Sequence, residues 1–222
     1  MRLRSLLFCL LLPLAASCAG EADTPVAREE RLLRAAREGD LEDIRALLDR
    51  GVDIEARNPG DGWTPLFWAA VRGKSQAVKL LLSRGAQIEV RDRQGLTALM
   101  AAARWGRKDG VGSLLEGGAR LNAADRNGWT ALMWASFKGQ TDMVAFLLDQ
   151  GAPLDGRDPG GRTPLMLAAM KGRVKAAELL LSRGASITAR TSERETASDL
   201  AKASGYDDLA RRIRARGVVT SR

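Results

Sequence analysis

A step of 33 residues organises this sequence: Thr97 lies 33 residues after Thr64, and three series of residues share that step. Three independent series in one register exclude chance. A fixed period between about 20 and 50 residues indicates a stacked array of small structural units. The series are Thr64, Thr97, Thr130, Thr163 and Thr196; Gly73, Gly106, Gly139, Gly172 and Gly205; and Gly85, Gly118, Gly151, Gly184 and Gly217.

The residue pattern of each unit predicts two helices joined by a tight turn. Thr130 is placed to cap a short first helix, because its hydroxyl can accept one of the unpaired N–H groups there. Gly139 is expected to end this helix in the left-handed conformation. A second helix with a wide apolar face follows over residues 143–148 and stops at Gly151. The polar turn at 158–161 then opens the next unit.

The unit resembles the ankyrin repeat, a family with a period of about 33 residues and a Thr-Pro-Leu-His pattern. Residues 64–70 read Thr-Pro-Leu-Phe-Trp-Ala-Ala, and residues 163–169 read Thr-Pro-Leu-Met-Leu-Ala-Ala. The resemblance covers residues 28–217 and implies an all-α solenoid, a stack of paired antiparallel helices joined by short β-hairpin-like loops. The chain has no His, and we expect apolar packing to support the loops where the family uses that His. Its position holds Phe67, Met100, Met133, Met166 and Asp199.

The repeat domain divides into six units. The two outer ones carry charged helix faces that suit terminal caps, whose outer sides meet water. Gly110 and Gly112 predict a loose or irregular second helix in the third unit, because each costs about 1 kcal/mol in a helix. Arg194 stands where other units have a turn glycine. The units are 28–57 (N-terminal cap), 58–90, 91–124, 125–157, 158–190 and 191–217 (C-terminal cap), and a tail at 218–222 is expected to fray.

The start of the chain has the features of an export signal. Two arginines precede an apolar run that ends near Ala16, and this run is shorter than the about 20 residues that span a bilayer. The small residues before Cys18 resemble the bacterial lipobox, although Leu14 lies four residues before the Cys, where the family prefers three. Cleavage after Ala19 without a lipid is the alternative.

We therefore expect a signal peptide at 1–18, lipidation of Cys18 and a flexible tether at 19–27. The expected location is the periplasm or the outer membrane, or the exterior if no lipid is added. Both cysteines lie in the leader, so the repeats contain no disulfide and depend on packing alone.

The composition excludes most classes of catalytic site. Without His there is no His-based triad and no imidazole metal ligand. The glycines are used in turns and form no phosphate-binding loop. We expect no catalytic residue, no cofactor and no metal. The net charge is +8, and basic residues that recur once in each repeat would attract an acidic partner. The sign of the net charge would also suit a nucleic acid, but the expected compartment argues against one.

The tryptophans and a basic stripe are the candidate binding residues. The ankyrin resemblance implies that the loops and first helices line a concave face that binds partners. Aromatic rings exposed there would act as hot spots of about 2 kcal/mol or more, whereas Trp68 and Trp134 favour packing within the stack. Solubilising charge explains the basic stripe equally well. The predicted partner-binding set is Trp63, Leu96, Trp105, Trp129 and Phe137, with Arg72, Arg104, Lys138 and Lys171 as the stripe.

The function expected from these features is that of an exported, lipid-anchored, monomeric scaffold that binds another protein and catalyses nothing. Two alternatives remain: a secreted effector that binds a host protein, and an envelope binder of an acidic polymer or lipid headgroup. If Trp63 and Trp129 face solvent, changing both to Ala abolishes partner capture and leaves thermal stability nearly unchanged.

Overall fold

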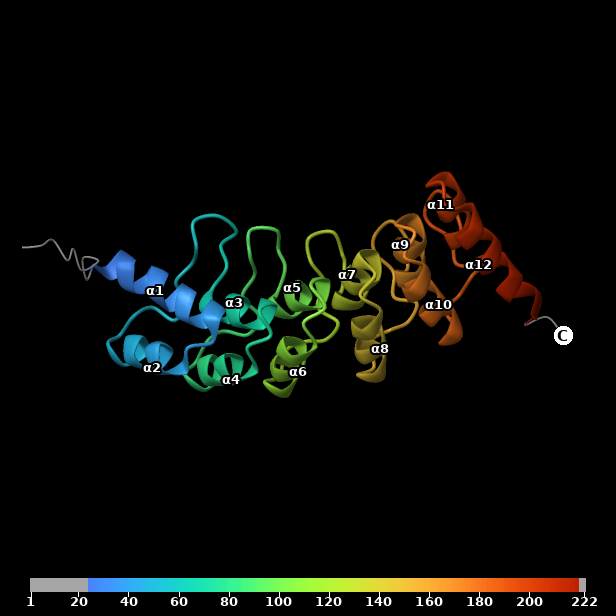
Figure 1. Cartoon of the computed structure of the whole chain (residues 1–222). Helices are drawn as coiled ribbons and strands as arrows, with labels where there is room; N and C mark the ends of the chain where they lie inside the picture. Colours follow the sequence, from blue (N-terminus) through green and yellow to red (C-terminus); the bar gives the residue numbers. More distant parts are fainter. Residues whose placement is uncertain (1–23, 220–222) are drawn as a thin grey trace, which may run out of the picture.

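Two parallel rows of helices make up the structure, a computed structural model that describes residues 24–219 and the side chains of 24–216 (Figure 1). Helices contact their neighbours in the row and their partner in the other row. The predicted all-α stack of paired helices is confirmed. The first row is α1 (Pro25–Glu38), α3 (Pro65–Val71), α5 (Ala98–Arg104), α7 (Ala131–Lys138), α9 (Pro164–Met170) and α11 (Ala197–Ala203). The second row is α2 (Leu41–Asp49), α4 (Ser75–Ser83), α6 (Lys108–Glu116), α8 (Thr141–Asp149), α10 (Val174–Ser182) and α12 (Asp207–Val219).

The recurring threonines cap the first-row helices as predicted. Each hydroxyl accepts the N–H of the residue three positions on, at 3.3 to 3.5 Å. Pro65 and Pro164 occupy the first helical position, where a missing N–H costs nothing. Gly139 ends α7 with a φ of 76°. The register seen in the sequence is therefore a register of helix starts and stops.

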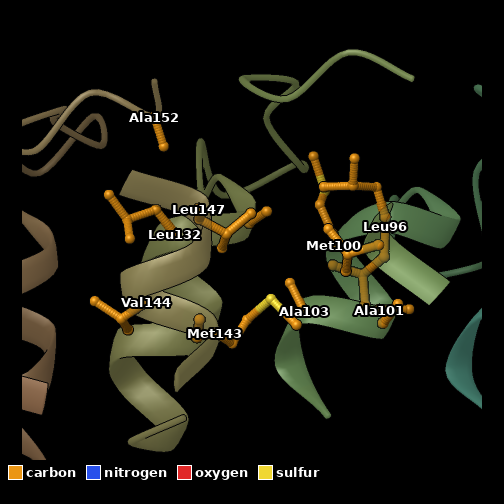
Figure 2. Packing of buried hydrophobic residues seen from close by; sticks show 14 of the residues in the cluster. Leu96, Met100, Ala101, Ala103, Leu132, Met143, Val144, Leu147 and Ala152 are labelled. Carbon is orange, nitrogen blue, oxygen red and sulfur yellow. The ribbon is translucent and has the colours of Figure 1, made fainter. Parts of the chain in front are cut away.

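One continuous hydrophobic core runs through the stack, from Leu32 in α1 to Ile213 in α12. Figure 2 shows this core where the repeat carrying α5 meets the repeat carrying α7 and α8. Small side chains such as Ala101 and Ala103 let neighbouring helices approach closely, while the leucines of α7 and α8 fill the space between the rows. Because no repeat buries its apolar surface alone, the stability of each repeat depends on its interfaces with the neighbouring repeats.

Helix α6 is a regular helix of nine residues, the same length as α4, α8 and α10, so the expectation of an irregular helix is wrong. The reason is tertiary. Gly110 is buried against the end of α3, and a Cβ at this position would lie 2.2 Å from the carbonyl oxygen of Ala70. The missing side chain permits close backbone contact that offsets the low helix propensity of glycine.

The boundaries at the chain ends differ from those expected. Helix α1 begins at Pro25, inside the predicted tether of 19–27, because the hydroxyl of Thr24 accepts the N–H of Ala27 at 3.1 Å. Helix α12 continues to Val219, beyond the predicted start of the tail. The predicted signal peptide, Cys18 and residues 19–23 lie outside the described residues, as do 220–222.

Arg194 has a φ of 65° and is the non-glycine residue with positive φ in the described part of the chain. The equivalent positions hold Gly62, Gly95, Gly128 and Gly161, all with positive φ. A Cβ in the left-handed conformation costs about 1 to 2 kcal/mol. We expect Arg194→Gly to raise the free energy of unfolding by about 1 kcal/mol, measured by urea denaturation. Arg194→Ala keeps the strained Cβ and should not raise it. Equal gains from both variants would assign the effect to the guanidinium instead of the backbone.

Candidate protein-binding face

Buried carboxylates hold the loops between repeats. Asp92, Asp125 and Asp158 recur every 33 residues and are only 5 to 8% exposed. One oxygen of each accepts backbone N–H groups of its own loop at 2.8 to 2.9 Å. This geometry closes each loop without a His. Sequence reasoning missed these residues, although their period of 33 was visible.

The side chains at the usual His position behave in two ways. The first four members, from Phe67 to Met166, are buried in the core as expected of an apolar ladder. The last, Asp199, is exposed and accepts the hydroxyl of Thr196 at 2.7 Å. That hydrogen bond, and then the one from the Thr196 N–H, hold the pKa of Asp199 below its ordinary value. Packing thus supports the first helices, while the buried carboxylates order the loops.

Two tryptophans link successive loops through these carboxylates. The indole N–H of Trp63 donates to the second oxygen of Asp92 at 3.1 Å, and that of Trp129 donates to Asp158 at 2.9 Å. The intervening repeat has Leu96, which has no side-chain donor. There the indole of Trp134, from the same repeat as Asp125, donates to that carboxylate at 2.9 Å.

These contacts correct the expected positions of two binding residues. Leu96 is 2% exposed and Trp129 is 8% exposed, so the expectation that they face a partner is wrong. Trp63 is half-buried, with its N–H engaged and its ring 4.8 Å from Trp68 between centroids. Trp68 and Trp134 pack within the stack, as the sequence favoured.

Four other predicted residues do form an exposed stripe. Arg72, Trp105, Lys138 and Lys171 occupy the same position of successive repeats, at the end of a first-row helix or directly after it. Trp105 is 51% exposed, the largest value for an aromatic side chain in the described range. In its repeat the ring takes the place that a cation has in the other three.

Two lysines of this stripe belong to a group of cations and rings that we call the central cluster: Arg104, Trp134, Phe137, Lys138 and Lys171. The guanidinium carbon of Arg104 lies 4.7 Å from the centroid of Trp134. The amines of Lys138 and Lys171 lie 5.8 and 5.1 Å from the centroid of Phe137. The cluster therefore joins three successive repeats through cation–π contacts.

Comparison with known proteins agrees with this architecture. The family model "Ankyrin repeats (3 copies)" matches residues 32–125 and 114–191, which is well over half of the chain. The chain belongs to the ankyrin-repeat family. It is similar to ankyrin repeat domain-containing protein 40 of mouse and of human, at 41% identity over 49 residues. That match covers 22% of this chain, 14% of the mouse protein and 13% of the human protein. Ankyrin repeats indicate a protein-interaction scaffold and are generally a non-enzymatic module.

Charge is distributed unequally over this ankyrin stack. Ion pairs between repeats join second-row helices, for example Arg84 with Asp49 at 2.7 Å and Arg183 with Asp149 at 2.9 Å. Within residues 24–216, no carboxylate forms an ion pair with the three cations of the central cluster. The Nε of Arg104 is buried without a hydrogen-bond acceptor.

The cations of the central cluster lie close enough to one another to affect the pKa of Lys138. Burial, and then repulsion from Arg104, Arg173 and Lys171, lowers the pKa of Lys138 below its ordinary value. Asp92, Asp125 and Asp158 form no ion pair with these three cations: their oxygens accept loop and indole N–H groups, and Asp158 pairs with Arg162 at 2.7 Å. The central cluster of the ankyrin protein is thus left with positive charge that no carboxylate of residues 24–216 pairs with.

Residues 24–219 contain no grouping of three or more Cys, Asp and Glu side chains arranged to hold a metal ion. None of their helices combines the length and apolar character needed to cross a membrane.

Proposed function

We propose that this ankyrin-repeat protein is a non-catalytic scaffold that binds another protein through the loops and first-row helices. The observation that carries the proposal is Trp105, a half-exposed indole beside cations that have no counter-ion. Trp and Arg are the residue types most enriched in binding hot spots. Arg104 and Trp105 are adjacent in the middle of this face, while the second-row cations Arg84 and Arg183 form ion pairs between repeats.

We further propose that the protein is exported, held at the membrane by a lipid on Cys18, and monomeric. The leader sequence supports export, and the small residues before Cys18 support lipidation. Charged residues cover the outer sides of α1 and α12, which suits stack ends that meet water and not a second copy. The compartment disfavours a nucleic acid as ligand.

The test of the binding face is affinity capture from the native envelope, followed by reconstitution with the purified partner. Trp105→Ala is expected to weaken binding about tenfold or more, because a hot-spot ring contributes about 2 kcal/mol. Val174→Ala is the matched control, because Val174 is also exposed but lies at the start of α10 in the second row. Equal binding by the wild type and Trp105→Ala would remove this face from the proposal.

The test of anchoring is the mass of the mature N-terminus, measured for the wild type and for Cys18→Ser. A diacylated or triacylated Cys18, absent in Cys18→Ser, is expected, with Cys9→Ser unchanged as the control. An unmodified N-terminus after Ala19 would support the alternative of a secreted effector. Capture of an acidic polymer or lipid, in place of a protein, would support the envelope-binder alternative, which the cations without counter-ions favour.

A further inference from the structure

We propose that the central cluster, together with Trp105, is the receptor for an extended acidic segment of the partner protein. The inference rests on the proposed function and deepens it by naming the chemistry of the partner. The segment would carry Asp or Glu side chains on one side and an apolar side chain beside Trp105.

The first support is the arrangement of cations and rings in the repeat register. Arg104 precedes Trp105, whereas Phe137 precedes Lys138, so cation and ring exchange places between adjacent repeats. Arg104 can therefore lie on Trp134 of the next repeat, and Lys171 on Phe137 of the preceding one. Arg37 lies over Trp68 in the same way, 5.8 Å from the ring centroid, near the N-terminal end of the stack.

The second support is that these contacts position the cations without neutralising them. A ring face attracts a cation but does not accept its in-plane N–H groups. The Nε of Arg104 is buried and has no acceptor, and its Nη1 has only a long contact of 3.4 Å with the side chain of Gln94, so the Nη groups are the donors left for a ligand. A guanidinium held in place matches a carboxylate in two parallel hydrogen bonds. Binding an acidic segment would therefore cost little ordering of the protein.

The third support is the line along which the charges lie. Arg104, Lys138 and Lys171 belong to three successive repeats of the first row, and packed helices are about 8 to 10 Å apart. A peptide in the extended polyproline II conformation advances about 3.1 Å per residue with three residues per turn, so every third side chain lies on the same side and matches this spacing. A single phosphate ion cannot span it. A bilayer is a poorer fit, because Trp134 and Phe137 are half-buried and carry cations on their faces instead of projecting outward.

The experiment measures the fluorescence anisotropy of a labelled synthetic peptide with Glu at every third position and one Leu. The matched peptide has Gln in place of each Glu. The mature chain is expected to bind the Glu peptide at least about tenfold more tightly than the Gln peptide, because a charge pair with one partner removed loses at least this factor. Arg104→Gln and Lys138→Gln should each weaken binding of the Glu peptide by a similar factor.

The controls separate a built site from net charge. Lys79→Gln and Arg84→Gln make the same change in charge on the second row, where both cations are ion-paired, and should leave binding of the Glu peptide unchanged. Arg104→Lys keeps the charge but loses the planar fork, so it should bind with intermediate affinity. Thermal denaturation by circular dichroism confirms that each variant is folded.

Three outcomes would overturn the inference: equal binding of the two peptides, equal loss in the second-row controls, or tighter Arg104-dependent binding to phosphatidylglycerol vesicles or inorganic phosphate than to the Glu peptide. The protein partner captured from the envelope separates this inference from the proposed function. If Trp105→Ala abolishes capture of this partner while Arg104→Gln and Lys138→Gln do not, the proposed scaffold function stands and the inference of an acidic segment is wrong. If the Glu peptide binds as expected but no protein is captured, the proposed function fails instead.

Discussion

The Gly110→Ala variant is expected to be less stable than the wild type by about 3 kcal/mol, the upper part of the usual range for overpacking. The new Cβ would lie 2.2 Å from the carbonyl oxygen of Ala70, which is backbone and cannot rotate away. Helix α6 would have to move from α3, and the contacts along both rows would shift with it. The measurement is the midpoint of urea denaturation, monitored by circular dichroism.

Gly112→Ala is the matched control in the same helix. Its Cβ would meet only the tip of the Phe146 ring, at 4.0 Å, an ordinary contact distance. We expect this variant to gain up to about 1 kcal/mol, because alanine has the higher helix propensity. The same substitution two residues apart thus has opposite expected signs. Destabilisation by both would mean that the helix as a whole tolerates no added side chain, and stabilisation by both would refute the close contact with Ala70.

The Trp129→Ala variant is expected to lose about 3 to 5 kcal/mol, the usual cost of truncating a buried Trp. The ring is 8% exposed, packs 4.7 Å from Trp134 between centroids, and donates its N–H to Asp158. This reverses the expectation that changing Trp63 and Trp129 to Ala would leave thermal stability nearly unchanged. The melting temperature of the folded chain measures the loss.

Two further substitutions divide this effect into its parts. Trp129→Phe keeps most of the ring and removes the N–H, so it should cost about 1 to 2 kcal/mol, because Asp158 loses one hydrogen bond while Arg162 still donates to the same oxygen. Trp105→Ala should change stability by less than about 0.5 kcal/mol, because its ring is half-exposed. An unchanged melting temperature for Trp129→Ala would contradict the burial of this ring and would assign it to the partner-facing surface.

The candidate site was only partly visible in the sequence. The exposed stripe of Arg72, Trp105, Lys138 and Lys171 followed from the repeat register, because the same position of each repeat meets the same environment. The binding role of its members stays a prediction. The burial of Trp129 did not follow, because its acceptor belongs to a residue 29 positions away. No local pattern distinguishes an indole that faces solvent from one that donates to the next loop.

The glycines of α6 illustrate the same difference. Intrinsic propensity predicts a weak helix from Gly110 and Gly112 alike. The contact of Gly110 with Ala70 shows that one of them is required by packing and the other is not. Propensity describes an isolated helix, whereas close backbone approach depends on a helix from the preceding repeat.

What the sequence determined by itself is the repeat, its helix pairs and their ends. The hydroxyl of each capping threonine reaches an N–H only three residues away, so a local pattern is sufficient evidence. What only the tertiary structure decided is which polar and aromatic groups meet between repeats. The buried carboxylates with their indole donors, and the cations on neighbouring rings, join residues about one repeat apart. Such contacts form only when the units stack, because stacking brings together groups that no short stretch of chain contains.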